Sequence, residues 1–284
     1  MSILTQLARR LRGGGRGRAD GYASPVHPDF LRAGAPAAAP GSWEEAMRVH
    51  QVPVDAAAER ARARNPVEEA FFAQDDRVAN KWHHYLEVYD RHLSRYRATG
   101  VRLLEIGVFQ GGSLQMWRRY LGDAARIHGL DINPRCAQID DPGLTVHIGS
   151  QIDRALLRRI VDAMGGIDVV IDDASHISEH QIATFETLYP LLAPDGVYIV
   201  EDVHASYWPE LGGGLRAPAA FMEYAKALLD RLHARYVLDP DPAARDPGFA
   251  DVTYGISFHD SMVVFEKRPK GAPRTMVVGS RWLS

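Results

Sequence analysis

Residues 104–113 read LEIGVFQGGS, and the architecture of the chain is most plainly visible there. An apolar run leads into a turn at Gly107, and a glycine pair beginning at Gly111 opens the segment that follows. A glycine at such a turn lets the backbone pass close to a ligand at the carboxyl end of a strand. We therefore expect a buried strand, a ligand-binding turn and a helix, in that order.

Short apolar runs and helical segments alternate from this point onward. The apolar runs predict strands at 101–108, 125–132, 144–148, 167–172 and 196–200. The segments between them predict helices at 113–121, 154–164 and 179–192. Strands that alternate with helices of this length form βαβ units and a parallel sheet that is covered on both faces.

The end of the chain breaks this alternation. Residues 254–259 and 261–267 are apolar runs separated by one residue, which predicts an antiparallel hairpin. A mostly parallel, Rossmann-like sheet with helices on both faces and a C-terminal antiparallel hairpin is the plan of the class I methyltransferases, which use S-adenosylmethionine (SAM). The predicted fold class is therefore α/β of that kind.

Composition divides the chain into four stretches. They are a flexible leader at 1–45, an N-terminal helical segment at 46–98, the sheet-containing domain at 99–270 and a tail at 271–284. The leader is rich in Gly, Ala and Pro and cannot bury enough apolar surface to order itself. Around the helical segment we expect one helix over 43–64, a break at Asn65-Pro66 and a second helix over 67–96.

Overall composition excludes several kinds of protein. The formal net charge of the 284 residues is -3, which gives no electrostatic reason to expect nucleic acid as a partner. Cys136 is the one cysteine, so the chain can form neither an internal disulfide nor a cysteine-based zinc site. No apolar run is long enough to span a membrane, and the basic start lacks the apolar core of a secretory signal. We expect a cytoplasmic enzyme without a membrane partner.

Acidic residues near the first two strands predict the cofactor. Asp131 follows Gly107 by 24 residues, close to where an acidic side chain binds the ribose hydroxyls of a nucleotide cofactor. NAD and SAM both fit that residue, but the loop lacks the Gly-x-Gly-x-x-Gly order typical of pyrophosphate binding. Glu105 precedes the turn instead, and a carboxylate there suits the cationic amino-acid end of SAM. Further expected cofactor residues are Gly111, Ser113, Ser150, Gln151 and Asp172, although Ser150 and Gln151 would also suit a helix cap.

Two acidic pairs, Asp172-Asp173 and Glu201-Asp202, follow the fourth and fifth predicted strands. Neighbouring parallel strands end at one edge of a sheet, about 5 Å apart, so carboxylates from both can reach one cation. Oxygen ligands without thiolates favour Mg²⁺, and we expect Asp173, Glu201 and Asp202 at that metal. The alternative is that Asp172 or Asp173 caps the following helix and that Glu201 is a solvated strand end.

His176 lies three residues beyond Asp173 and is the expected general base. A neutral imidazole alone does not readily deprotonate an alcohol, but a divalent ion lowers the pKa of a coordinated hydroxyl. The two groups together therefore suit methyl transfer to oxygen. Taken in isolation, a histidine at this position would more simply begin a helix and bond to its neighbours.

Longer stretches resemble a known family. Residues 171–180 read IDDASHISEH and residues 200–208 read VEDVHASYW, and both are similar to the metal-dependent sugar O-methyltransferases of antibiotic biosynthesis. These include the mycinamicin and macrocin deoxysugar methyltransferases, and the group also resembles the rhamnosyl methyltransferases and the proteins known as cephalosporin hydroxylases. The resemblance spans about 81–267 and includes KWHHY at 81–85 and HDSMVVFEK at 259–267.

This resemblance implies a site and an acceptor. Mg²⁺ would be bound by Asp173 and Asp202, with Glu201 near the site and His176 as the base. The acceptor would be a sugar hydroxyl, and the side chains that help to shape its pocket would be His84, Tyr207 and Trp208. The chain departs from the family pattern in its first 65 residues and at His259, where an aromatic residue is expected.

Four functions stay open on the sequence. We favour SAM- and Mg²⁺-dependent methylation of a hydroxyl on a small-molecule glycoside or saccharide, either a glycosylated natural product or a polysaccharide. The others are methylation of another small molecule such as a catechol, oxidation or reduction with a nicotinamide cofactor, and ligand binding without catalysis. A homo-oligomer is compatible with every one of these functions.

Overall fold

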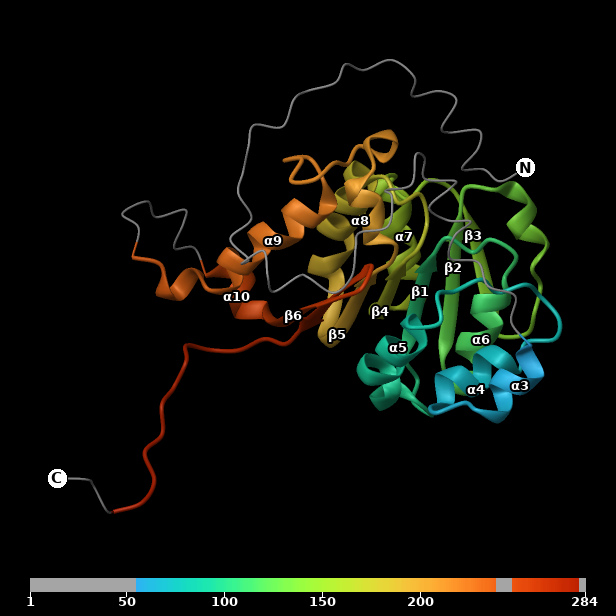
Figure 1. The fold of residues 1–284 in the computed structure, drawn as a ribbon, viewed down its shortest axis with the longest axis horizontal. Coiled ribbons are helices and arrows are strands. Elements are labelled where there is room, and N and C mark those ends of the chain that lie inside the picture. Colours follow the sequence, from blue (N-terminus) through green and yellow to red (C-terminus); the bar gives the residue numbers. More distant parts are fainter. Residues whose placement is uncertain (1–54, 239–246, 281–284) are drawn as a thin grey trace, which may run out of the picture. The chain divides into compact units, whose positions relative to one another are not determined.

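One seven-stranded sheet organises the computed structural model, which describes residues 55–238 and 247–280 (Figure 1). Its strand order is β3-β2-β1-β4-β5-β7-β6. The strands are β1 (Arg102–Ile106), β2 (Arg126–Asp131), β3 (Leu144–Ile148), β4 (Ile167–Asp172), β5 (Leu192–Val200), β6 (Thr253–His259) and β7 (Met262–Lys267). Strands β1 to β5 are parallel, and β7 is antiparallel to both β5 and β6. The predicted sheet with a C-terminal antiparallel hairpin is confirmed.

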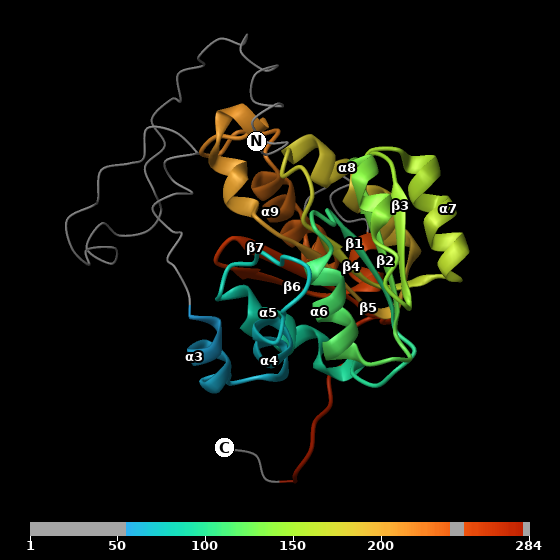
Figure 2. The same cartoon turned by 90° about the vertical axis from the view of Figure 1, so that its right-hand side faces the viewer.

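Both faces of the sheet are covered by helices, and side chains that alternate along the central strands pack against each layer. In β4, Val169 and Ile171 pack into one apolar core, whereas Val170 packs into the other. The first core includes α4 (Pro66–Phe72), α5 (Tyr85–Leu93) and α6 (Gly112–Leu121), and the second includes α7 (Arg154–Met164), α8 (Ser178–Leu188) and α9 (Phe221–Leu232). Figure 2 shows α5 and α6 on one side of the sheet and α7 and α8 on the other.

Shorter elements complete the described part of the chain. They are α3 (Ala56–Ala61), α10 (Gly248–Val252) and the 3-10 turns η2 (Ser94–Tyr96), η3 (Pro134–Gln138), η4 (Tyr189–Leu191), η5 (Val203–Tyr207), η6 (Pro209–Leu211) and η7 (Ala234–Tyr236). A search of the described residues finds no helix that is both long and apolar enough to cross a membrane.

The sequence patterns placed most elements close to their observed bounds. Strands β3 and β4 and helix α7 begin and end where predicted. Strand β5 begins at Leu192 rather than at Gly196, and α8 ends at Leu188 rather than at Leu192. Helix α9 was not predicted from the sequence.

The single helix predicted over 67–96 is wrong. Helix α4 ends at Phe72, α5 begins at Tyr85, and the residues between them are not helical. This connecting segment (residues 73–84) passes over the start of α6 so closely that a Cβ on Gly112 would lie 2.4 Å from the carbonyl carbon of Val78. Tertiary packing therefore outweighs the local helix propensity.

The predictions for the two ends of the chain can be compared only in part with the described residues. Of the helix predicted over 43–64, residues 56–61 are helical as α3. Residues 43–54 and the leader predicted at 1–45 lie outside the described residues. Residues 271–280 of the predicted tail contain neither helix nor strand.

The carboxyl ends of β1, β4 and β5 lie side by side, and the predicted site follows them. Asp172 pairs with Ile106 on one side and with Val200 on the other. The backbone N–H of Asp173 donates to the Ile106 carbonyl at 2.8 Å, and that of Glu201 donates to the Asp172 carbonyl at 2.9 Å. The residues immediately after these three strands are therefore neighbours in space.

Candidate active site

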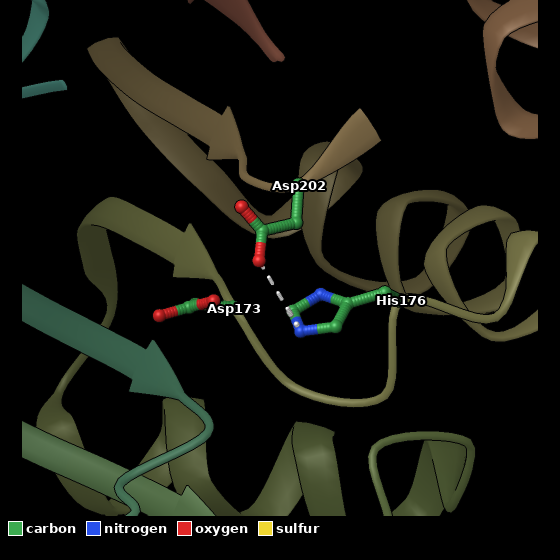
Figure 3. Close-up of side chains that lie close together, drawn as sticks. All are labelled: Asp173, His176 and Asp202. Atoms are coloured by element: carbon green, nitrogen blue, oxygen red, sulfur yellow. Dashed lines mark ion pairs between the residues drawn. The ribbon is translucent and has the colours of Figure 1, made fainter. Parts of the chain in front are cut away.

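Asp173, His176 and Asp202 form an acidic cluster at this edge of the sheet. Each residue offers one potential ligand atom, and these atoms lie within 4.8 Å of one another. Figure 3 shows both carboxylates and the imidazole pointing toward a common space from the loops that follow β4 and β5. Nε2 of His176 lies 3.5 Å from Oδ2 of Asp202. The structure thus brings the expected base together with two of the three expected metal ligands.

The backbone at two of these residues is strained. His176 has a φ angle of 56° and Asp202 has one of 53°, both in the left-handed region that favours glycine. Residues with a Cβ in that region cost free energy, and they are concentrated at functional sites. The two turns direct these side chains toward each other, as Figure 3 shows.

The donor set of this cluster fits a divalent cation. Two carboxylates are ligands that Mg²⁺ accepts, with water and substrate oxygens completing the coordination, and the neighbouring imidazole is left to act as a base. In addition, Nδ1 of His176 is buried and has no hydrogen-bond partner among the described residues. A buried polar atom without a partner costs about 1–3 kcal/mol, so this nitrogen points to a ligand or an ordered water in the site.

Tyr85, the last residue of the KWHHY motif, holds Asp202 in place. Its hydroxyl donates to Oδ1 of Asp202 at 2.7 Å and accepts from the Asp202 backbone N–H at 3.2 Å. Burial, together with the Asp202 charge, raises the pKa of Tyr85 far above its ordinary value, so the hydroxyl stays protonated and remains a donor. Helix α5 therefore fixes one carboxylate of the cluster.

Lys81 lies on the buried side of the cluster, where it contacts Asp173. It was not among the predicted site residues. Its ammonium lies 2.5 Å from Asp173, 3.0 Å from Glu201 and 3.4 Å from Glu105. Burial alone lowers the pKa of a lysine, but the charges of Asp173 and the two glutamates outweigh it, so the pKa of Lys81 lies well above its usual range. The side chain is 2% exposed, and it carries its charge in the protein interior.

Glu201, one of the three predicted metal ligands, lies beside the acidic cluster. It is buried, and its carboxylate accepts from Tyr89 at 2.6 Å and from Lys81 at 3.1 and 3.0 Å. Burial and the neighbouring Asp173 charge raise the pKa of Glu201, whereas the Lys81 ammonium and the Tyr89 hydroxyl stabilise its charged form and oppose this rise. The solvated strand end that was the alternative for Glu201 is wrong, because β5 ends inside the protein.

Glu105 is fully buried at the end of β1. Its carboxylate accepts from the hydroxyl of Ser113 at 2.6 Å and from the indole of Trp117 at 3.2 Å, and it pairs with Lys81. Burial raises the pKa of Glu105 above its ordinary value. Its carboxylate is thus already engaged by protein groups, and Ser113, expected beside the cofactor, is one of them.

The glycine turn after β1 is shaped by close packing. A Cβ on Gly107 would lie 2.0 Å from the carbonyl oxygen of Asp173, and its φ angle is +98°, so no other residue fits without a shift. Gly111 has a φ angle of 85° and caps α6. Asp131 lies at this turn as well, because its carboxylate accepts from the N–H groups of Val108 at 2.9 Å and Phe109 at 3.0 Å.

Gln151 ties the loops after β3 and β4 together. Its amide donates to Asp172 at 3.2 Å and accepts from the backbone N–H of Ser175 at 3.1 Å. The hydroxyl of Ser150 accepts from the backbone N–H of Ile152 at 3.4 Å, whereas Asp153 is the residue that caps α7. Asp172 is buried, and this burial raises its pKa to about 8.

Aromatic side chains join the connecting segment before α5 to η5, the turn that follows Asp202. The rings of Trp82 and His204 are 5.8 Å apart, and those of His204 and Trp208 are 4.7 Å apart. His84 continues this row, with its ring 5.8 Å from that of Trp82. Tyr207, at the end of η5, is 45% exposed. Two of the three expected pocket residues, His84 and Trp208, thus belong to one row of rings, which we call the aromatic row.

His259, which departs from the expected family pattern, contacts His92 on α5. Its Nε2 is 3.4 Å from Nε2 of His92 on α5, and the two rings meet edge to face. The imidazole therefore occupies, against α5, the position where the resemblance implies an aromatic side chain.

Comparison with known proteins agrees with this geometry. A family model described as a methyltransferase domain matches residues 104–203. The 8-demethyl-8-alpha-L-rhamnosyl tetracenomycin-C 2'-O-methyltransferase of Streptomyces olivaceus is 38% identical over 205 residues, which cover 67% of this chain and 52% of the relative. The demethylmacrocin O-methyltransferase of Streptomyces fradiae is 34% identical over 201 residues, which cover 66% and 50%. The chain is a homologue of sugar O-methyltransferases.

Solved structures extend the similarity of this methyltransferase homologue. The MycE methyltransferase from the mycinamycin biosynthetic pathway, in complex with Mg and SAH, is 30% identical with a TM-score of 0.62. The matched region covers 80% of this chain and 58% of the MycE chain. The same enzyme in complex with Mg, SAH and mycinamycin VI gives a TM-score of 0.63 at 28% identity. The chain spans about half the length of the curated relatives it matches. The class I methyltransferase fold predicted from the sequence is therefore confirmed.

Proposed function

We propose that the protein transfers a methyl group from SAM to a sugar hydroxyl on a glycosylated natural product, with Mg²⁺ as a second cofactor. The observation that carries this proposal is the acidic cluster of Asp173, His176 and Asp202, which lies beside the glycine turn after β1. Relatives named for methylation of tetracenomycin rhamnosyl, macrocin and mycinamicin substrates support the sugar acceptor.

The cofactor would lie over the turn after β1. Asp131 is the residue we assign to the ribose hydroxyls, since its carboxylate lies at the turn and keeps acceptor capacity for hydroxyl donors beside the two backbone N–H groups. Gly107 leaves room for the cofactor, and Gln151 fixes the loop on which Ser150 would approach the adenine. We now assign Glu105 to Lys81 rather than to the amino-acid end of SAM, because its carboxylate is fully buried and already paired.

Chemistry at the acceptor depends on the cluster. When bound, SAM supplies an electrophilic methyl group and Mg²⁺ lowers the pKa of a coordinated hydroxyl. Asp173 and Asp202 would hold the metal. His176 accepts the hydroxyl proton at Nε2, and the resulting imidazolium is stabilised by Oδ2 of Asp202, 3.5 Å away. Tyr85 keeps Asp202 oriented throughout, and correct positioning of the acceptor oxygen supplies much of the remaining rate.

The aromatic row is the surface we assign to the sugar. Apolar faces of sugar rings pack on aromatic side chains, and the row begins at His84, whose Nε2 lies 3.1 Å from the Asp260 carbonyl oxygen. Trp208 and the exposed Tyr207 would complete the surface on the η5 side. Methylation of a catechol, by contrast, would not need a surface of this extent. A homo-oligomeric state and a cytoplasmic location remain predictions.

Calorimetry separates the competing functions. We expect binding of SAM and of S-adenosylhomocysteine but not of NAD, and we expect Mg²⁺ to strengthen methyl transfer in a screen of glycosides with labelled SAM. Binding of NAD without binding of either sulfur cofactor would indicate a nicotinamide enzyme, and cofactor binding without turnover on any glycoside or catechol would favour a non-catalytic protein.

The metal assignment has its own test. Asp202→Asn keeps the size of the side chain and removes one charged ligand, so both methyl transfer and its dependence on Mg²⁺ should be lost. Full activity of the wild-type protein in EDTA would refute the metal site.

A further inference from the structure

Lys81 connects the carboxyl ends of β1, β4 and β5, which we call the acidic edge. Its ammonium contacts Glu105 near the end of β1, Asp173 after β4 and Glu201 after β5, at 3.4, 2.5 and 3.0 Å. The side chain comes from the connecting segment, which is not part of the sheet. One cation therefore ties three strand ends to a segment from outside the sheet.

The charges around Lys81 show why a cation is needed there. Glu105 and Glu201 are 0% and 1% exposed, and burying an unpaired carboxylate is very costly. The other groups that donate to these two carboxylates are neutral, namely Ser113, Trp117 and Tyr89. The ammonium of Lys81 is the charge of opposite sign that the structure places against both of them.

Lys81 also contacts the acidic cluster directly. Oδ2 of Asp173 faces the ammonium at 2.5 Å, while the Asp173 side chain is 19% exposed and lies in the cluster with His176 and Asp202. The ammonium thus holds this carboxylate from the buried side and leaves its exposed side toward the site. It also holds Glu201, whose backbone is followed directly by Asp202.

We propose that Lys81 is the permanent counter-ion of the carboxylates at the metal centre. Its ammonium is the resident cation of the acidic edge: it orients Asp173 and Glu201 and lets the three strand ends pack together before any divalent ion binds. This inference rests on the proposed function in so far as Asp173 is a metal ligand.

Lys81 also links the metal centre to the aromatic row, the surface assigned to the sugar. Trp82, which follows Lys81, lies in the aromatic row between His84 and His204. The connecting segment is further held by its close passage over Gly112. Lys81 therefore fixes, with one side chain, both the carboxylates and the segment that carries Trp82 and His84.

Thermal unfolding of the full chain, with and without Mg²⁺, tests the proposal. Lys81→Met keeps the apolar stem and removes the charge. In EDTA this variant should unfold about 10 °C below the wild type, because removal of one partner from a buried ion pair leaves the other charges uncompensated. Saturating Mg²⁺ should then raise its Tm by about 5 °C more than it raises that of the wild type, since carboxylates without their resident cation gain more from a divalent ion.

Lys226→Met is the matched control. Lys226 pairs with Glu223 on α9, and its side chain is 44% exposed. The substitution makes the same change of charge and size away from the acidic edge. We expect a Tm within about 2 °C of the wild type and an unchanged response to Mg²⁺.

A second variant covers the case in which Lys81→Met does not fold. Lys81→Met/Glu105→Gln removes one charge of each sign, and the introduced amide can accept from the indole of Trp117 through its oxygen and donate to the hydroxyl of Ser113 through its nitrogen. It should regain at least half of the lost Tm and keep the enlarged response to Mg²⁺. A Mg²⁺ increment in this variant that is equal to or smaller than that of the wild type would show that a divalent ion does not replace the charge of Lys81, and would overturn the proposal.

The assay contains neither SAM nor an acceptor, so it is independent of methyl transfer. If the wild type shows no turnover and Lys81→Met still gains the larger Mg²⁺ increment, the role of Lys81 stands and the proposed function fails. If the wild type methylates a glycoside and the increments are equal, the proposed function stands and the role of Lys81 fails.

Discussion

Replacing Tyr85 by Phe removes the hydroxyl that holds Asp202. That hydroxyl has one proton to donate, and its oxygen lies 2.7 Å from Oδ1 of Asp202 and 3.0 Å from the Ser261 carbonyl oxygen. It also accepts from the backbone N–H of Asp202 at 3.2 Å. A hydrogen bond to a charged acceptor contributes about 1.5–3 kcal/mol and a neutral one about 1 kcal/mol. Tyr85→Phe should therefore lower the free energy of unfolding by about 2–4 kcal/mol, or Tm by about 5–15 °C.

The same substitution should weaken the metal site. Without the hydroxyl, the Asp202 carboxylate can rotate away from Asp173 and His176, and its strained backbone loses one of its anchors. We expect about tenfold weaker binding of Mg²⁺, which corresponds to about 1.4 kcal/mol. Calorimetric titration with Mg²⁺, carried out well below the Tm of the variant, measures this change without any need for an acceptor.

Tyr120→Phe supplies the control. The Tyr120 ring is also buried, and its hydroxyl donates to Asp90 at 2.9 Å, outside the acidic cluster. This variant should lose stability by about 1.5–3 kcal/mol while its affinity for Mg²⁺ stays at the wild-type value. Equal Mg²⁺ affinities in Tyr85→Phe and Tyr120→Phe would refute the reasoning, because the Tyr85 hydroxyl would then serve stability alone.

Three further substitutions test other parts of the site. His176→Ala should keep the affinity for S-adenosylhomocysteine and lower turnover by about 10²–10⁴-fold, and unchanged turnover would remove His176 from the mechanism. Gly107→Ala should weaken binding of S-adenosylhomocysteine at least about tenfold, because the added Cβ meets the Asp173 carbonyl at 2.0 Å, whereas Gly255→Ala, which meets nothing within 4 Å, should bind normally. Burial raises the pKa of Asp172 to about 8, so the folded chain retains a proton that the unfolded chain releases near pH 4, and stability is lost as the pH rises through this window. In urea unfolding, Asp172→Asn should therefore be more stable than the wild type at pH 8, with the difference shrinking toward pH 4; a difference independent of pH would contradict the burial of a protonated Asp172.

Most of the fold could be predicted from local patterns. Apolar runs between turn residues mark β1 to β5, and the closely spaced runs at the end mark the β6–β7 hairpin. These signals are strong because a strand buried on both faces must be apolar throughout, whatever its neighbours are. Parallel strands also end at one edge, so the meeting of Asp173, His176 and Asp202 could be expected before their distances were known.

Side-chain partners, in contrast, depended on contacts between distant parts of the chain. Glu105 looked like a cofactor ligand from its place before Gly107, yet its carboxylate is engaged by Ser113, Trp117 and Lys81. Nothing in the local sequence distinguishes a carboxylate that faces a ligand from one that faces a buried lysine. That distinction needs the path of the connecting segment, which was expected to be helical.

The sequence was sufficient for the positions of the strands along the chain, the glycine turn and the set of acids at the edge, because each follows from short-range periodicity and from the geometry of parallel sheets. The tertiary structure alone assigned Lys81 to three carboxylates and Tyr85 to Asp202, across separations of 92, 120 and 117 residues for Asp173, Glu201 and Asp202. Buried charges must be paired, but which cation pairs with them is decided by packing between segments far apart in the chain.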